Sequence, residues 1–305
     1  MSYQAKPVRA FVMTSDALSQ KLFGGVFLVK ANQQRAGIKI LDACRKGRKI
    51  CSLLDVKNPA PVDFVLTEFD RAVHDAVVSE LAAGNKFFTF NMLYRDLGGN
   101  TKDPVPAAMK KAITESLAKL KFLILDLDMS DAAENSSYKI TQKKLAGGLI
   151  DVVFGKTSLN GKPVEAYQIR GALLNTVANS KNQIIRLAVD TLDLKLRLTP
   201  RVIAIVHYII RRVAQITGSH KSASLGKKNL RLSTSITFAN LNKCCGFRGL
   251  KRWQRQDIRE ITAQILNAFV EKKLLQSWQF SVSPTGEFRA IKLELAPLVF
   301  DKFVK

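Results

Sequence analysis

A short pattern that occurs twice, at a constant offset, constrains the fold of this chain more than any other sequence feature. The segment Thr89-Phe90-x-x-Leu93 returns as Thr237-Phe238-x-x-Leu241, 148 positions later. Two further pairs keep this offset: Gly98 with Gly246, and Ile113 with Ile261. Because the matched residues fall in matching predicted elements, we interpret the pattern as a tandem duplication. The simpler alternative is two compact helical domains with similar packing needs.

Each copy is predicted to contain the same series of elements: helix, short strand, helix, turn, helix and β-hairpin. Thr67 is a good N-cap for the first helix, with Asp70 in the capping-box position. Thr199-Pro200 begins the corresponding helix of the second copy, with Pro at the first helical position. This series is typical of a winged helix. The predicted fold class is therefore α+β, with two winged-helix domains in tandem (helix-turn-helix with a β-hairpin wing).

The predicted wing strands are 123–129 with 138–141 in the first copy, and 274–282 with 288–295 in the second. The sequence predicts four regions: a basic, partly β N-terminal extension (1–60), winged-helix domain 1 (61–145), a connecting segment with a hairpin and a helix (146–197), and winged-helix domain 2 (198–305). Strands are expected at 23–29 and 50–56, with a basic run between them. A second hairpin is expected around Asn160-Gly161, which favours a tight turn.

Positive charge is concentrated in one part of the chain. The 305 residues carry a formal net charge of +23, an excess that favours a polyanionic partner. Residues 194–260 hold 15 Lys and Arg against 2 Asp and Glu, a balance of +13. Residues 61–145 hold 11 against 12, a balance of −1. The charge therefore assigns nucleic-acid binding mainly to the second copy.

The stretch Gly246 to Leu275 combines a basic first half with an apolar second half. Apolar residues recur at helical spacing and predict a buried face, namely Ile258, Ile261, Ile265, Phe269 and Leu274. Arg and Gln side chains occur three and four residues apart on another face, and these are the side chains that bond guanine and adenine edges bidentately. A solvated basic face on an ordinary helix is the alternative. Phe247 and Trp253 are expected to fix the helix start to the core, in preference to stacking on bases.

The predicted DNA-binding residues form two sets. The base-reading surface consists of Arg248, Lys251, Arg252, Arg255, Gln256 and Arg259. The phosphate-binding set beside it consists of Lys221, Lys227, Lys228 and Arg231, and Lys243 is a further predicted DNA-binding residue. Most of the second set belongs to a polar loop predicted over 220–229, and loop lysines suit phosphates, which carry no sequence information.

Catalytic and metal-binding constellations are not recognisable in the sequence, so we expect no catalytic residues, no metal, no cofactor and no enzyme activity. There are 3 His, and no Gly-x-x-x-x-Gly-Lys-Ser/Thr loop is present. The 4 Cys lack the common zinc spacing. The apolar run 202–213 is too short to cross a bilayer and the first residues lack a signal-peptide core, so we expect a cytoplasmic protein without a membrane partner.

The chain resembles the replication initiator proteins of iteron-containing, theta-replicating plasmids over roughly residues 60–300. The resemblance is carried by the architecture, by Leu-Thr-Glu-Phe-Asp-Arg-Ala-Val at Leu66–Val73, by the two Thr-Phe-x-x-Leu units, and by Leu-Thr-Pro-Arg at Leu198–Arg201. It implies a sequence-specific protein that binds repeated origin sites in double-stranded DNA, chiefly with its second domain.

The same resemblance implies partners, but parts of the chain depart from the family pattern. It implies host replication proteins (a helicase or its loader) as partners, a homodimer through the first domain, and association with the plasmid or nucleoid. The N-terminal 60 residues and the near-neutral first domain depart from the family pattern. A transcriptional regulator of a phage or mobile element with tandem winged helices is the alternative function.

Overall fold

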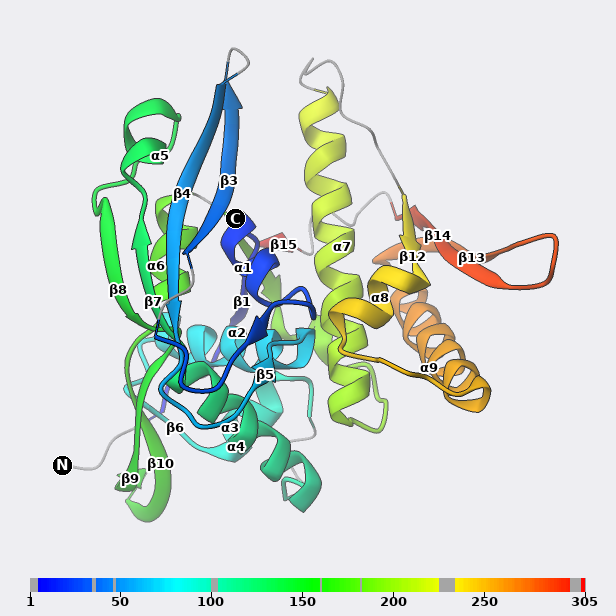
Figure 1. The fold of residues 1–305 in the computed structure, drawn as a ribbon. Helices are drawn as coiled ribbons and strands as arrows, with labels where there is room; N and C mark the ends of the chain where they lie inside the picture. Colours follow the sequence, from blue (N-terminus) through cyan, green and yellow to red (C-terminus); the bar gives the residue numbers. More distant parts are fainter. Residues whose placement is uncertain are drawn as a thin grey trace.

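Two long helices pack against each other at the centre of the molecule (Figure 1). They are α2 (Glu68–Ala82) and α7 (Pro200–Ser224). The computed structural model describes residues 5–34, 37–45, 48–99, 104–159, 161–181, 183–224, 234–296 and 303–304. Over these residues the chain is a mixture of helices and mainly antiparallel sheets, which confirms the α+β class.

Helix α2 begins where the sequence predicts. The Thr67 N–H donates to Asp70 Oδ2 at 2.8 Å, and the Thr67 hydroxyl donates to the same oxygen at 2.9 Å. These bonds satisfy groups that a helix start leaves unpaired. The helix is buried on almost every side, because β1 (Ala10–Thr14), α4 (Ala107–Phe122) and α7 all pack on it.

The second repeat forms a continuous series that opens with α7 and is drawn at the right of Figure 1. After α7 come β12 (Ser235–Thr237), α8 (Phe238–Cys244), α9 (Arg252–Glu271), β13 (Leu275–Val282) and β14 (Phe288–Leu295). The short strand β12 pairs with β14, the second strand of the hairpin, which gives the order β12-β14-β13. Helix α7 continues past its predicted end near 217, so 218–224 are helical and not part of a loop.

The strands of the first repeat pair in the same order, but the hairpin that takes part is not the one predicted at 123–129 and 138–141. Its helices and short strand are α2, β6 (Phe87–Phe88), α3 (Phe90–Asp96) and α4. Strand β6 pairs with β10 (Lys162–Gly171), whose hairpin partner is β9 (Asp151–Leu159), so the order is β6-β10-β9. The hairpin strands themselves are confirmed. They complete the first repeat's sheet, so the pairing crosses the boundary predicted at residue 145.

The wing predicted over 123–141 is wrong in its second strand. Strand β7 (Ile124–Asp128) forms as expected, but Tyr138–Thr141 is not a strand. The return strand is β8 (Lys144–Gly148), because the short helix α5 (Ser130–Asn135) takes up the predicted turn. The Met129 N–H donates to the Lys143 carbonyl at 2.7 Å and closes the connection, so the return strand begins at Lys144 and not at the predicted Tyr138.

The N-terminal 60 residues are joined to the first repeat by strand pairing. Strands β3 (Gly37–Arg45) and β4 (Arg48–Lys57) form a hairpin, and β4 pairs with β7 in the sheet β3-β4-β7-β8. Strand β1 pairs with β11 (Ile184–Ala188), in the sheet β1-β11-β15. Pairing therefore crosses the boundary predicted at residue 60 as well.

A strand predicted over 23–29 is mostly absent. Helix α1 (Ala17–Leu22) precedes it, capped by Asp16, which accepts the Ser19 N–H at 2.9 Å. The chain then turns at Gly25, whose φ of 70° suits glycine, so extended structure begins only at β2 (Leu28–Val29). The remaining elements are β5 (Phe64–Val65), α6 (Leu173–Ser180), the 3₁₀ helix η1 (Val189–Leu192) and β15 (Phe303–Val304).

A buried ion network joins α7 to α2. The Arg211 guanidinium donates from Nε to Glu68 Oε1 at 2.8 Å and from Nη1 to Asp75 Oδ2 at 3.1 Å. It also donates to the Thr14 carbonyl of β1 at 3.1 Å. All three charged side chains are at most 3% exposed. Burial alone would raise the pKa of Asp75, but Arg211 and then His74 hold that pKa below its usual value.

The Arg211→Met variant tests this network. It should lower the free energy of unfolding by about 3–5 kcal/mol, because it leaves the carboxylates of Glu68 and Asp75 buried without their cation. Urea denaturation followed by circular dichroism measures the change. Arg170→Met is the matched control, because Arg170 is exposed on β10 and should change stability by at most about 0.5 kcal/mol. Equal effects in the two variants would contradict the assigned role.

His207 supplies a pH dependence with a definite sign. Burial, and after it the charge of Arg211, lower the pKa of His207 from 6.5 to about 3. Between these two pH values, His207 therefore binds a proton in the unfolded chain but not in the folded chain. The contribution of His207 to stability is complete above pH 6.5 and falls as the pH drops from 6.5 towards 3, by up to about 1.4 kcal/mol per pH unit.

The His207→Leu variant isolates this contribution. Between pH 7.5 and 5 the free energy of unfolding of the wild type should fall by about 2 kcal/mol more than that of the variant. Urea midpoints measured across this range give the difference, in which the other titrating groups cancel. Parallel pH profiles for the two proteins would show that His207 is not buried in its neutral form.

Candidate nucleic-acid interface

Helix α9 is held at its N-terminal end by a tight turn and a capping bond. Gly246 has a φ of 77°, and a Cβ there would lie 2.6 Å from Thr67 Cγ2, so only glycine fits beside the start of α2. The Lys251 N–H donates to Gln254 Oε1 at 2.9 Å. The buried face of the helix is Ile258, Thr262, Ile265, Leu266 and Phe269, as the apolar spacing predicts.

The first two turns of α9 present exposed Arg and Gln side chains. Arg252, Arg255 and Gln256 are all exposed. Arg255 Nε donates to the Leu250 carbonyl at 3.1 Å, which orients the guanidinium and uses one of its five donors. Gln256 Nε2 donates to Glu260 Oε1 at 3.0 Å. The structure therefore brings these three predicted readers together on one solvent-facing surface.

A groove separates this surface from the β13–β14 turn. Arg252, Arg255 and Arg259 line one side, and 285–288 line the other. The Arg259 guanidinium carbon lies 4.3 Å from the centre of the Phe288 ring, within the range of a cation–π contact. The ring of Phe280 in turn meets Phe288 edge-on. Arg259 therefore ties the helix to the hairpin and also borders the groove.

Two other predicted DNA-binding residues lie elsewhere. Arg248 donates from Nη2 to the carbonyl oxygen of Gly25, so its guanidinium connects the turn before α9 to the N-terminal segment. Lys243 is exposed at the end of α8 and lines a separate groove with Lys21 and Arg212. Lys251 is exposed and stands next to the α9 face as the N-cap residue.

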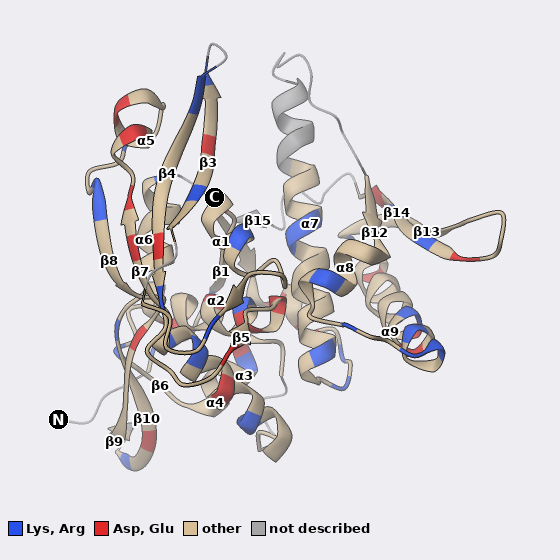
Figure 2. Cartoon of the chain, in the orientation of Figure 1, with Lys and Arg blue, Asp and Glu red and all other residues tan. Residues whose placement is uncertain are grey.

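Much of the predicted phosphate-binding set falls outside the part of the chain that can be described. Lys227, Lys228 and Arg231 lie outside the described residues. Lys221 belongs to the last turns of α7, where the backbone alone is described. Their role therefore stays a prediction from the sequence. Figure 2 shows Lys and Arg along the described part of α7 and at the start of α9.

The two aromatic residues near the start of α9 behave differently. Phe247 is partly buried and packs on the core, as predicted. The expectation for Trp253 was wrong, because its side chain is 63% exposed. Sequence spacing gives no signal for this difference, because both residues flank arginines in the same way. The fixing contacts come from Arg201, which lies over the Phe247 ring at 5.8 Å and pairs with Asp257.

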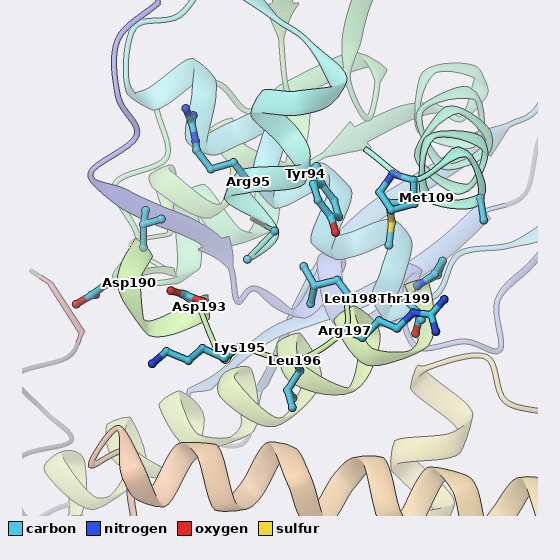
Figure 3. Close-up of a pocket in the computed structure, with 16 residues that line it drawn as sticks. Tyr94, Arg95, Met109, Asp190, Asp193, Lys195, Leu196, Arg197, Leu198 and Thr199 are labelled. Atoms are coloured by element: carbon cyan, nitrogen blue, oxygen red, sulfur yellow. The ribbon is translucent and has the colours of Figure 1, made fainter. Parts of the chain in front are cut away.

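A large cavity lies away from this surface, between the first repeat and the segment that leads to α7 (Figure 3). Its lining includes Tyr94 and Met109 on one side and Lys195, Arg197 and Leu198 on the other. The lining residues include no His or Cys. Across the described residues, no group of three or more His, Cys, Asp or Glu could hold a metal ion.

No helix among the described residues has the length and apolarity needed to cross a bilayer. No family model matches the chain, and no curated protein matches it. Among solved structures, a selenomethionine crystal structure of domains 2 and 3 of RctB is similar with a TM-score of 0.42 and 10% identity, over 91% of this chain and 97% of that chain. A further crystal structure of RctB domains 2–3 gives 0.40 and 8%, over 88% and 94%. Similarities below a TM-score of 0.5 do not establish a common fold.

The position of Arg248 leads to a prediction that separates it from Arg252. Arg248→Ala should lower the free energy of unfolding by about 1 kcal/mol, because it removes a charge-assisted hydrogen bond to the Gly25 carbonyl. Arg252→Ala should leave stability within about 0.5 kcal/mol, because Arg252 is a solvent-exposed side chain. Thermal and urea unfolding of the two variants provide the comparison. A larger loss in Arg252→Ala would reverse the two assignments.

Proposed function

We propose that this protein is a sequence-specific double-stranded DNA-binding protein whose second repeat, α7–β12–α8–α9–β13–β14, is a winged helix with α9 as its recognition helix. The observation that carries the proposal is the exposed group of Arg252, Arg255 and Gln256 in the first turns of α9. A recognition helix contacts base edges with its N-terminal residues. The positive balance of 194–260 supports the same assignment, since phosphate attraction dominates DNA affinity.

The first repeat is proposed to be a second winged helix with an insertion. Its series is α2–β6–α3–α4–β9–β10, and the segment β7–α5–β8 is inserted between α4 and β9. The order β6-β10-β9 matches β12-β14-β13, which supports the duplication. The near-neutral balance of 61–145 favours a smaller share of DNA contacts for this repeat.

Within DNA binding, we propose initiation of plasmid or mobile-element replication at repeated origin sites. The resemblance in sequence to iteron-type initiators supports this finer assignment. It also supports a helicase or helicase loader as partner, and a homodimer through the first repeat. The alternative is a transcriptional regulator. Direct repeats beside the gene that the protein binds would favour the initiator, and an inverted repeat in a promoter would favour the regulator.

The protein is further proposed to act without catalysing a reaction. The proposal is supported by the absence of recognisable catalytic motifs in the sequence. Incubation of supercoiled DNA with the protein and Mg²⁺ or Mn²⁺ tests it. The expected result is intact supercoiled DNA, and metal-dependent nicking would revive the nuclease class.

The Arg255→Ala variant tests the recognition helix. Binding-site selection on random duplexes first defines the site. Fluorescence anisotropy with the full chain then compares that site with a scrambled duplex across a salt series. Arg255→Ala should cost about 1–3 kcal/mol on the selected site and much less on the scrambled duplex, because base contacts carry specificity.

Lys228→Ala is the contrasting variant, and Arg170→Ala is the neutral control. Lys228→Ala should weaken both duplexes to a similar degree and lower the salt slope by about 1, as loss of one phosphate contact does. Arg170→Ala should leave both affinities unchanged. Equal weakening of both duplexes by Arg255→Ala would show that α9 is not the reader.

A further inference from the structure

Trp253 exposes a larger fraction of its surface than any other large hydrophobic side chain among the described residues, at 63%. Tryptophan is highly buried on average, because its indole carries a large apolar surface. The residue occupies the second position of α9, directly after Arg252. An exposed indole at the start of a helix that presents Arg and Gln to solvent requires a physical account.

Contacts within the chain do not explain why Trp253 is held in this exposed position. Phe247 and Leu250, which precede Trp253 in the same turn, are partly buried and pack on the core. The chain's other tryptophan, Trp278, donates from Nε1 to Asn267 Oδ1 at 3.0 Å and meets the Phe280 ring edge-on. Among the described residues, Trp253 has neither a hydrogen-bond partner nor a ring contact of this kind. Its indole surface is available to a partner.

Helix geometry places Trp253 beside the proposed base readers. Residues three and four apart are neighbours on a helix surface. Gln256 therefore lies between Trp253, three residues before it, and Arg252, four residues before it. All three side chains are exposed. The solvent face at the start of α9 therefore presents an apolar ring, a bidentate amide and a guanidinium side by side.

We propose that Trp253 packs on the C5-methyl group of a thymine in the major groove and so makes the protein select an A·T pair at that position. The proposal rests on the proposed function, because it needs α9 in the major groove. The major-groove edge of thymine carries the apolar methyl group, and apolar side chains read it by contact. Gln256, its neighbour, suits adenine N6 and N7. Together they favour A·T pairs at adjacent positions of the site.

A methyl contact fits this residue better than stacking on unpaired bases. Stacking platforms use several aromatic side chains along a groove that follows a single strand. The other aromatic ring of the turn, Phe247, packs on the core, and Phe288 across the groove already contacts Arg259 over its ring and Phe280 edge-on. One isolated indole at a helix start therefore matches a base edge in a duplex.

The experiment replaces thymine by uracil, which removes the methyl group and keeps the Watson–Crick and major-groove hydrogen-bonding atoms. Thymines of the selected site are replaced one at a time, on both strands, and the full-length chain is titrated by fluorescence anisotropy. At one position the wild type should bind the uracil duplex about fourfold more weakly, the factor that burial of one methyl group gives. Trp253→Ala should bind the two duplexes equally.

Two variants serve as controls. Trp253→Phe keeps an apolar ring and should retain part of the preference for thymine. Trp278→Phe changes the tryptophan that is tied to Asn267, and it should keep the full preference. Because Trp253 is exposed, its variants should unfold at the wild-type urea midpoint, so a lost preference cannot be ascribed to misfolding.

The outcomes distinguish a failure of the Trp253 inference from a failure of the proposed function. If the wild type binds its selected duplex but no single uracil weakens it, the Trp253 inference fails and the proposed function stands. A preference for thymine that survives in Trp253→Ala also overturns the inference. If Trp253→Ala loses binding to single-stranded DNA alone, the indole stacks on unpaired bases and the methyl contact is wrong. If the wild type shows no preference among duplexes, the inference and the proposed function both fail.

Discussion

The position of the second repeat depends on one buried cation, the Arg211 guanidinium. It comes from α7 and bonds Glu68 and Asp75 of α2 together with the Thr14 carbonyl of β1. A buried charge is tolerated only when its partners surround it, so a displaced α7 would leave three desolvated groups unpaired. The ion network therefore holds α7 at the position along α2 where these groups are paired.

The same network explains why the N-terminal residues belong to the body of the protein. Arg71 of α2 also donates to the Thr14 carbonyl, and burial followed by the charge of Arg211 lowers the pKa of Arg71 to about 10. Two guanidinium groups thus converge on one carbonyl oxygen at the end of β1. They are balanced by acidic groups on α2 and by Asp16, which precedes α1. Removing the first residues would leave these cations without part of their counter-charge, so 1–60 and the first repeat form one structural unit.

The sequence predicted the elements of the second repeat well, because its signals are local. The helix start at Thr199-Pro200, the apolar spacing of α9 and the hairpin strands 274–282 and 288–295 each involve residues a few positions apart. The pairing partners of strands in the first repeat could not be predicted in this way. Strand β6 has two residues and pairs with β10 across a long stretch of chain, and alternating apolar residues in β7 suit any partner. Arg248 lies apart from Arg252 because its guanidinium bonds the distant Gly25 carbonyl, and no sequence pattern near Arg248 indicates that partner.

Contacts around the turn before α9 fix the proposed DNA-binding surface relative to the rest of the protein. The turn before α9 touches the first repeat at Thr67, against which Gly246 lies, and the N-terminal segment at the Gly25 carbonyl, which Arg248 bonds. A Cβ at Gly25 would lie 1.8 Å from the Lys243 carbonyl oxygen, so the N-terminal segment fits closely against the end of α8. The start of α9 is therefore fixed relative to the start of α2 and to the N-terminal segment by close contacts at Gly246 and Gly25 that leave no room for a Cβ. If both repeats contact DNA, their spacing along the duplex is set by this packing and not by the length of the connecting segment, because the segment between them is itself paired into the sheets of the first repeat.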